Sequence, residues 1–163
     1  MTDLVTTDDL FFNRAGLHRA RVEMLVDEAL GGADDGELFL EYRQSESIVL
    51  DDGKVKSAAF DTMQGFGLRA VAGEATGYAH ASEFGAAALK RAADTVSAVT
   101  RGHDGEITAA PAGTNADLYA DDNPLSAVPF DSKLGLLSEM DAYARQKDER
   151  VKQVNATLSG EWQ

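Results

Sequence analysis

The fold is decided by the stretch Gln64-Gly65-Phe66-Gly67-Leu68-Arg69-Ala70-Val71-Ala72-Gly73-Glu74-Ala75-Thr76-Gly77-Tyr78-Ala79. It predicts a hairpin of two strands, 65–71 and 76–81, because Gly73 suits the first central position of a type II′ turn. Upstream, Asp52-Gly53 is typical of a type I′ turn between a strand that begins at Glu37 and a return strand over 55–60. Successive strands joined by such tight turns predict an antiparallel meander, not βαβ crossovers.

Helical spacing of apolar residues surrounds this meander. It predicts a first helix over 17–30 and a second that Ser82 can cap, running to about Arg101, with a buried stripe that includes Leu89 and Val96. A third helix is capped by Asp131 or Ser132 and carries Leu134, Leu137, Met140 and Ala144. Alternation over 154–158 predicts a last strand. The fold class is therefore α+β, an antiparallel meander of four to five strands with two to three helices packed on one face.

Length and composition exclude several classes of protein. The chain has 163 residues, a formal net charge of −13 and no cysteine. The length predicts a single domain over residues 1–163. Without cysteine there is no disulfide framework, thiolate nucleophile or Cys-ligated zinc. The negative charge argues against nucleic-acid binding, because phosphates would be repelled. The acidic N-terminus and the lack of a long apolar segment predict a cytoplasmic location and no membrane partner.

The sequence offers no self-contained catalytic, cofactor-binding or metal site. Its three histidines, His18, His80 and His103, lie in separate segments without a second ligand at metal-binding spacing. No Gly-x-Ser-x-Gly elbow is present. The adjacent carboxylates, such as Asp34-Asp35 and Asp51-Asp52, fall in expected turns, where aspartate is favoured by local hydrogen bonding.

The glycines between 65 and 77 have two explanations. Glycine weakens a strand, and it is tolerated where a bulge forms or where another chain segment approaches closely. A meander packed tightly under a helix would explain them. So would a groove or subunit seam, and in that case Gly65, Gly67 and Arg69 are the candidate surface, with Arg69 as a fixed donor.

Several segments carry a family resemblance. They are the stretch 64–79, the hairpin around Asp52-Gly53, Gly36-Glu37-Leu38-Phe39-Leu40-Glu41-Tyr42, and Lys147-x-x-Arg150-Val151-x-Gln153-Val154-x-Ala156-x-Leu158-Ser159-Gly160. They resemble the N-terminal region of the TldD branch of the TldD/PmbA metalloproteases, also called modulators of DNA gyrase. The likeness extends over nearly the whole chain from about Leu17.

The resemblance implies an intracellular zinc peptidase that cleaves unfolded or flexible peptides. It also implies assembly as a homo-oligomer or as a heterodimer with a TldE (PmbA)-like subunit. The family's zinc-binding His-Glu-x-x-x-His helix lies downstream of this region, so the catalytic C-terminal domain is expected to be absent from the chain. The chain would then be inactive alone, holding no zinc itself and contributing to the substrate cavity and to subunit assembly. The alternative is a stand-alone module that captures a peptide or a subunit on an exposed strand edge. The ending Gly160-Glu161-Trp162-Gln163, directly after a strand, suggests a cut chain.

Overall fold

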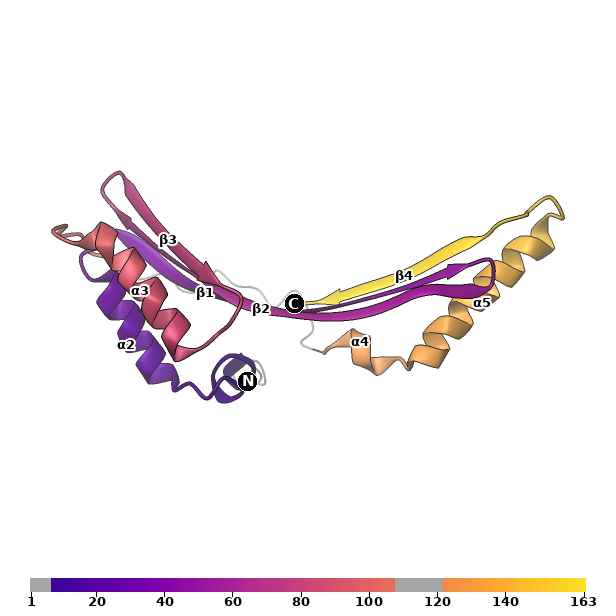
Figure 1. The fold of residues 1–163 in the computed structure, drawn as a ribbon, viewed down its shortest axis with the longest axis horizontal. Helices are drawn as coiled ribbons and strands as arrows, with labels where there is room; N and C mark the ends of the chain where they lie inside the picture. The colour runs from indigo at the N-terminus through magenta and orange to yellow at the C-terminus, as the bar shows by residue number, and fades with distance from the viewer. Residues whose placement is uncertain (1–6, 108–121) are drawn as a thin grey trace. The chain divides into compact units, whose positions relative to one another are not determined.

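Four strands form one sheet in the computed structural model, which describes residues 7–107 and 122–163. They are β1 (Asp35–Asp51), β2 (Lys54–Ala72), β3 (Ala75–Ala81) and β4 (Asn155–Trp162). Their order in the sheet is β3-β2-β1-β4 (Figure 1), and β3 and β4 pair antiparallel with β2 and β1. The α+β meander predicted from the sequence is confirmed.

The described helices are η1 (Asp9–Asn13), α2 (Arg19–Leu30), α3 (Ala86–Thr100), α4 (Pro124–Ala127) and α5 (Phe130–Lys147). The first of these described helices, η1, is a short π-helix that buries Phe12. None of the described helices is long and apolar enough to cross a membrane.

Both predicted hairpin turns are confirmed by their backbone angles. Asp52 and Gly53 have φ of 50° and 73°, as a type I′ turn requires. Gly73 has φ of 59° at the first central position of the next turn, as in type II′. The separation of 55–60 from 65–71 is wrong, because both belong to β2. The four residues between them contain neither glycine nor proline, so no turn interrupts the strand.

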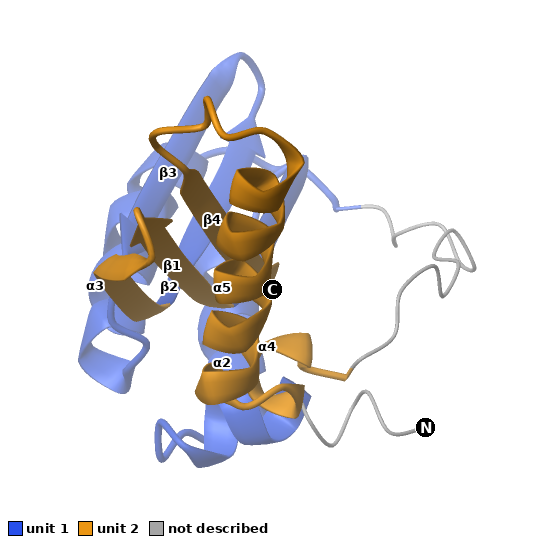
Figure 2. Ribbon diagram, turned by 90° about the vertical axis from the view of Figure 1, so that its right-hand side faces the viewer, with its two compact units in different colours: residues 1–42, 63–120 blue, residues 43–62, 121–163 orange. Residues whose placement is uncertain are grey.

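The structure divides into two compact units (Figure 2). Unit 1 comprises residues 1–42 and 63–120, and unit 2 comprises residues 43–62 and 121–163. Strands β1 and β2 contribute residues to both units. The single domain over residues 1–163 stays a prediction. Helix α4 lies between α3 and α5, and residues 108–121 of this connection lie outside the described residues.

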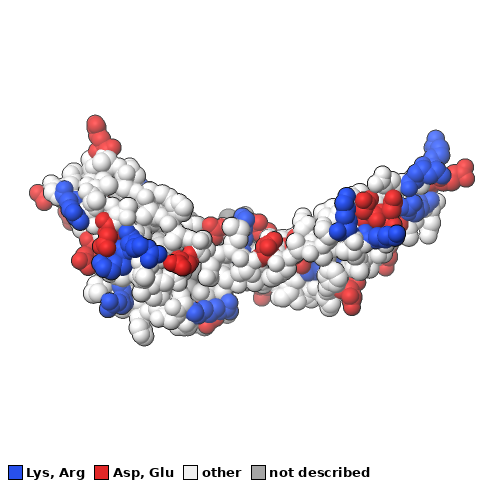
Figure 3. All heavy atoms as spheres, viewed as in Figure 1, with Lys and Arg blue, Asp and Glu red and all other residues white. Residues whose placement is uncertain are grey.

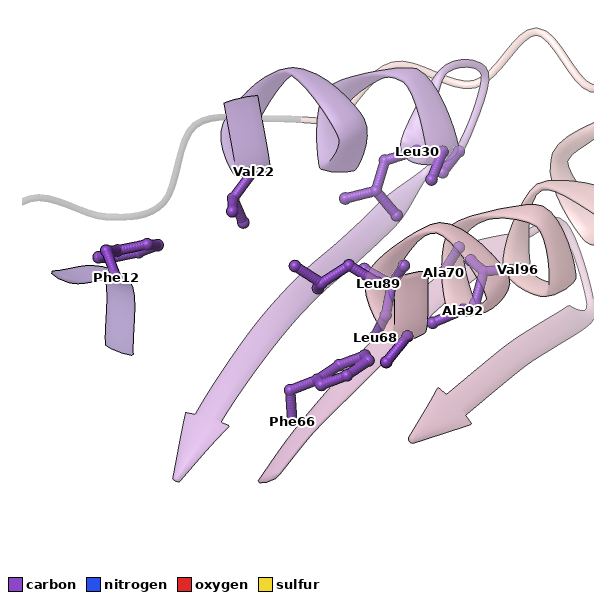
Figure 4. Packing of buried hydrophobic residues seen from close by; sticks show 12 residues of the cluster. Phe12, Val22, Leu30, Phe66, Leu68, Ala70, Leu89, Ala92 and Val96 are labelled. Carbon is purple, nitrogen blue, oxygen red and sulfur yellow. The ribbon is translucent and has the colours of Figure 1, made fainter. Parts of the chain in front are cut away.

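The core of unit 1 lies between the sheet and helices α2 and α3. Leu68 and Ala70 of β2 point toward Leu89 and Val96 of α3 (Figure 4), and all four are almost fully buried. Helix α3 begins at Ala86, after Gly85, and has no side-chain cap. The predicted Ser82 cap is therefore wrong, because the chain stays non-helical for three more residues after Ser82.

The core of unit 2 is smaller and consists of Ile48, Leu50, Ala156 and Leu137. Leu137 of α5 is buried in this core, whereas Met140, which the sequence places at helical spacing from it, is 52% exposed. Helix α5 begins one residue before Asp131, and Pro129 occupies the N-cap position, so neither Asp131 nor Ser132 is the cap. The side chain of Lys133 in α5 is also buried, and its ammonium group donates hydrogen bonds to the Glu46 carboxylate of β1.

Candidate functional site on the open face of the sheet

Alternate side chains of β1, β2 and β3 in unit 1 face opposite sides of the sheet. Those at Leu38, Leu40 and Leu68 pack into the core beneath the helices. The neighbouring positions form the other side, which we call the open face. Its residues are Asp35, Glu37, Phe39, Glu41, Met63, Gly65, Gly67, Arg69, Tyr78 and His80.

The open face contains a hollow of about 320 Å³. Its wall is built from three exposed apolar or aromatic side chains, Phe39, Met63 and Tyr78, each more than half exposed. The rings of Tyr78 and His80 stack with their centroids 5.7 Å apart and an interplanar angle of 30°. The side chain of Glu41 also lines the hollow. Exposed apolar side chains grouped in this way are typical of a binding surface.

Gly65 and Gly67 form the floor of this hollow. A Cβ atom on Gly67 would lie 2.7 Å from the Tyr78 hydroxyl, and one on Gly65 would lie 2.7 Å from the Ala81 carbonyl oxygen. Gly77 faces the opposite side of the sheet, where a Cβ atom on it would lie 2.9 Å from a methyl carbon of Val99 in α3. Both explanations for the glycines therefore have a structural counterpart: Gly77 packs under a helix, and Gly65 and Gly67 underlie a hollow.

Arg69 lies on the open face beside this hollow and bonds to two carboxylates of β1. Its Nη2 donates to Asp35 Oδ2 at 2.6 Å and its Nε donates to Glu37 Oε1 at 3.0 Å. These two carboxylates, Asp35 foremost, raise the pKa of the guanidinium above its ordinary value. Arg69 thus joins β2 to β1, and its part in binding stays a prediction.

The histidines do not gather into a metal site. His80 stacks on Tyr78, and His103 Nε2 lies 2.8 Å from Asp34 Oδ2. The same carboxylate oxygen accepts the Gly73 N–H at 2.7 Å, and these two contacts, the Gly73 bond foremost, lower the pKa of Asp34. Among residues 7–107 and 122–163, no group of three or more His, Cys, Asp or Glu side chains could hold a metal ion.

The sequence of this region matches a known family. Residues 36–100 match the model of PmbA/TldA metallopeptidase domain 1, and this range includes every residue that lines the hollow. The chain carries domain 1 of the PmbA/TldD family. A metalloprotease TldD homolog of Haemophilus influenzae is 36% identical over 130 residues, covering 77% of this chain and 27% of the relative. One from Buchnera aphidicola (subsp. Schizaphis graminum) is 30% identical over 165 residues, covering 100% of this chain and 34% of the relative.

The chain thus spans about a quarter to a third of these relatives, whose names agree with the TldD branch expected from the sequence. Solved structures share the fold of this domain 1. A candidate modulator of DNA gyrase from Bacteroides thetaiotaomicron superposes with a TM-score of 0.64 at 18% identity, covering 87% of this chain and 34% of that one. TldE from Thermococcus kodakarensis superposes with a TM-score of 0.61 at 16% identity, covering 85% of this chain and 33% of TldE.

A second surface of this PmbA/TldD chain lies in unit 2, along the first half of β2. β3 pairs with β2 only from Phe66 to Ala72, so the edge of β2 before Phe66 has no β3 residue beside it. Every residue from Lys54 to Gln64 is exposed. Beside this edge, Phe60 lines a hollow of about 290 Å³ together with Val128 and Phe130. An exposed strand edge with apolar side chains is a ready template for pairing with another chain.

Sequence reasoning proposed Gly65, Gly67 and Arg69 as a candidate surface, which stays a prediction, and did not include the side chains beside them. Phe39 and Tyr78 line the hollow, and neither was among the candidates. Phe39 could have been found, because it alternates with Leu38 and Leu40 and therefore had to point away from their core. Tyr78 could have been found from the hairpin, whose register pairs it with Arg69.

Proposed function

We propose that this chain is the non-catalytic first domain of a TldD-type zinc metallopeptidase that cleaves unfolded or flexible peptides in the cytoplasm. The observation that carries the proposal is the match of residues 36–100 to domain 1 of a metallopeptidase family, together with relatives named as TldD metalloproteases. Zinc and the catalytic groups would be supplied by a His-Glu-x-x-x-His helix downstream of this domain, as the resemblance implies.

In this proposal the open face forms part of the wall of the substrate cavity. Its hollow is apolar and aromatic at the rim, and Gly67 in its floor leaves room for the Tyr78 ring to lie close to the sheet. These properties suit an extended, flexible chain whose side chains alternate between the hollow and solvent.

The exposed edge of β2 would serve subunit assembly, either between copies of this protein or with a TldE (PmbA)-like subunit. Two observations support this role. β3 does not pair with β2 before Phe66, and this part of β2 carries the exposed apolar side chains of Val55 and Phe60. On the face shown in Figure 3, basic side chains lie beside acidic ones, so a continuous basic track for nucleic acid is not seen there.

The first experiment compares the 163-residue chain with the product of the complete reading frame. A frame that continues past Gln163 to a His-Glu-x-x-x-His segment is expected, and its product should cleave a flexible fluorogenic peptide in a chelator-sensitive way. The 163-residue chain should not. Chelator-sensitive cleavage by the 163-residue chain would contradict the proposal.

Arg69→Ala in the longer product tests the remaining candidate residue. Because Arg69 ties β1 to β2 on the open face, the change is expected to lower peptide turnover or subunit assembly. If both stay unchanged while the protein remains folded, Arg69 has no part in the function.

The alternative is a stand-alone module that binds a peptide or a subunit without enzymatic activity. The edge of β2 before Phe66, with which β3 does not pair, favours it, because strand addition needs no catalytic group. A stop codon directly after Gln163, with peptide or subunit binding by the chain, would support this alternative over the first proposal.

A further inference from the structure

The hollow on the open face has a charge as well as a shape. Glu41 lines it, and none of the lysines or arginines that the structure describes forms an ion pair with this carboxylate. Glu41 also borders a neighbouring hollow with Arg14, but Arg14 Nε bonds to Asp9 Oδ2 at 2.9 Å. Within the described part of the chain, no cation therefore pairs with the carboxylate in this hollow.

The rest of the open face adds to this negative character. Besides Glu41, the face carries two carboxylates, Asp35 and Glu37, and both bond to the guanidinium of Arg69. The whole chain has the same sign, with 28 acidic and 15 basic residues. A cationic ligand is therefore attracted both by the hollow and by its surroundings.

The aromatic side chains of the hollow suit the same ligand. Tyr78 is 60% exposed, and its ring is held against His80 above the glycine floor. Phe39 is 55% exposed on the neighbouring part of the face. A guanidinium or ammonium group stacks on such rings through cation–π attraction, and a carboxylate nearby adds a charge-assisted hydrogen bond. Arginine fits best, because its planar group can do both at once.

We propose that this hollow binds a basic side chain, arginine above all, of a flexible peptide. The inference rests on the proposed function, in which the open face contacts the substrate, and it adds a substrate preference to it. Glu41 supplies the charge, Tyr78 and Phe39 supply the stacking surfaces, and Gly67 leaves the space in which Tyr78 lies.

The test is an NMR titration of the ¹⁵N-labelled 163-residue chain with acetyl-Gly-Ser-Gly-Arg-Gly-Ser-Gly-amide. The matched probe has citrulline in place of arginine, so that shape is kept and charge is removed. The arginine peptide is expected to shift the amides of Gly65, Gly67 and Tyr78, with a Kd about fivefold lower than that of the citrulline peptide.

Two variants and two controls assign the effect to the hollow. Tyr78→Ala and Glu41→Gln are each expected to weaken binding of the arginine peptide about threefold. Tyr143→Ala removes a tyrosine that is equally exposed, at 61%, but lies on α5 of unit 2, and it should leave the Kd unchanged. Glu74→Gln, in the exposed turn before β3, should do the same.

Equal affinity for the arginine and citrulline peptides would overturn the inference. If the Tyr78→Ala variant then bound both peptides more weakly, and by the same factor, the open face would still contact peptide and the proposed function would stand. A single-stranded oligothymidylate that shifted the same amides in place of the arginine peptide would also overturn it. The cleavage experiment on the longer product is independent of all these results, so failure of the proposed function is seen separately.

Discussion

The buried ion pair of unit 2 offers a quantitative test of how α5 is held to the sheet. Lys133 Nζ donates to the two carboxylate oxygens of Glu46 at 2.6 and 2.7 Å and to the Leu125 carbonyl oxygen at 2.6 Å. The side chains of Lys133 and Glu46 are only 8% and 13% exposed. Lys133→Met removes the cation and leaves the Glu46 carboxylate buried without a partner.

Removing one member of a buried pair costs about 3–5 kcal/mol. We expect the lower end, about 3 kcal/mol, because Glu46 borders a hollow that water can enter. Replacing both residues, in Lys133→Met with Glu46→Met, should restore most of the loss, since an apolar pair of similar volume needs no charge partner.

The assay is urea unfolding followed by the fluorescence of Trp162, the single tryptophan, which pairs with Gln44 at the end of β4 in unit 2. A loss of 3 kcal/mol lowers the midpoint by roughly 1.5–3 M urea for a small unit. Lys147→Met is the control, because Lys147 is exposed at the end of α5. A loss below about 1 kcal/mol in Lys133→Met, or a double variant no more stable than the single one, would refute this reasoning.

Three further predictions concern unit 1 and the hairpin turns. Gly53→Ala should destabilise the chain by about 1 kcal/mol in thermal unfolding, because φ is 73° there, and an unchanged Tm would contradict this. Gly67→Ala should displace the Tyr78 ring, seen as shifted ring resonances, since the added Cβ would lie 2.7 Å from its hydroxyl. The hydrogen bond from the Gly73 N–H lowers the pKa of Asp34 in the folded state. The Asp34 carboxylate therefore stabilises the fold above the pKa that it has in the unfolded chain, and this stabilisation is lost as the pH falls through its pKa in the folded state. The Tm advantage over Asp34→Asn should therefore shrink from about pH 5 to pH 2, and a constant difference would contradict it.

Local signals in the sequence were enough to predict the turns and the fold class. Asp52-Gly53 and Gly73 determine their turns through backbone angles that few other residues adopt, so no distant contact is needed to place them. The continuity of β2 was missed because strand ends depend on pairing as well as on propensity. Helical spacing did not distinguish the buried Leu137 from the exposed Met140, because spacing alone does not show which side of a helix packs on the sheet.

The candidate site could be predicted only in part. The density of glycines marked Gly65 and Gly67, since glycine in a strand needs a reason that can be seen in the sequence. The side chains above them come from β1 and β3, and they meet only once both hairpin turns have set the register between the strands. The ion pairs of Arg69 with Asp35 and Glu37 depend on the same register.

The central claim is that the open face of unit 1 contacts the peptide. Site-specific photocrosslinking tests it directly, with p-benzoylphenylalanine replacing Phe39 on the open face or, as control, Phe60 on the edge of β2. Both phenylalanines are exposed to nearly the same extent, at 55% and 58%, so accessibility is matched. The account predicts a crosslink to the arginine peptide from position 39 and none from position 60. Equal crosslinking from both positions, or crosslinking from position 60 alone, would contradict it.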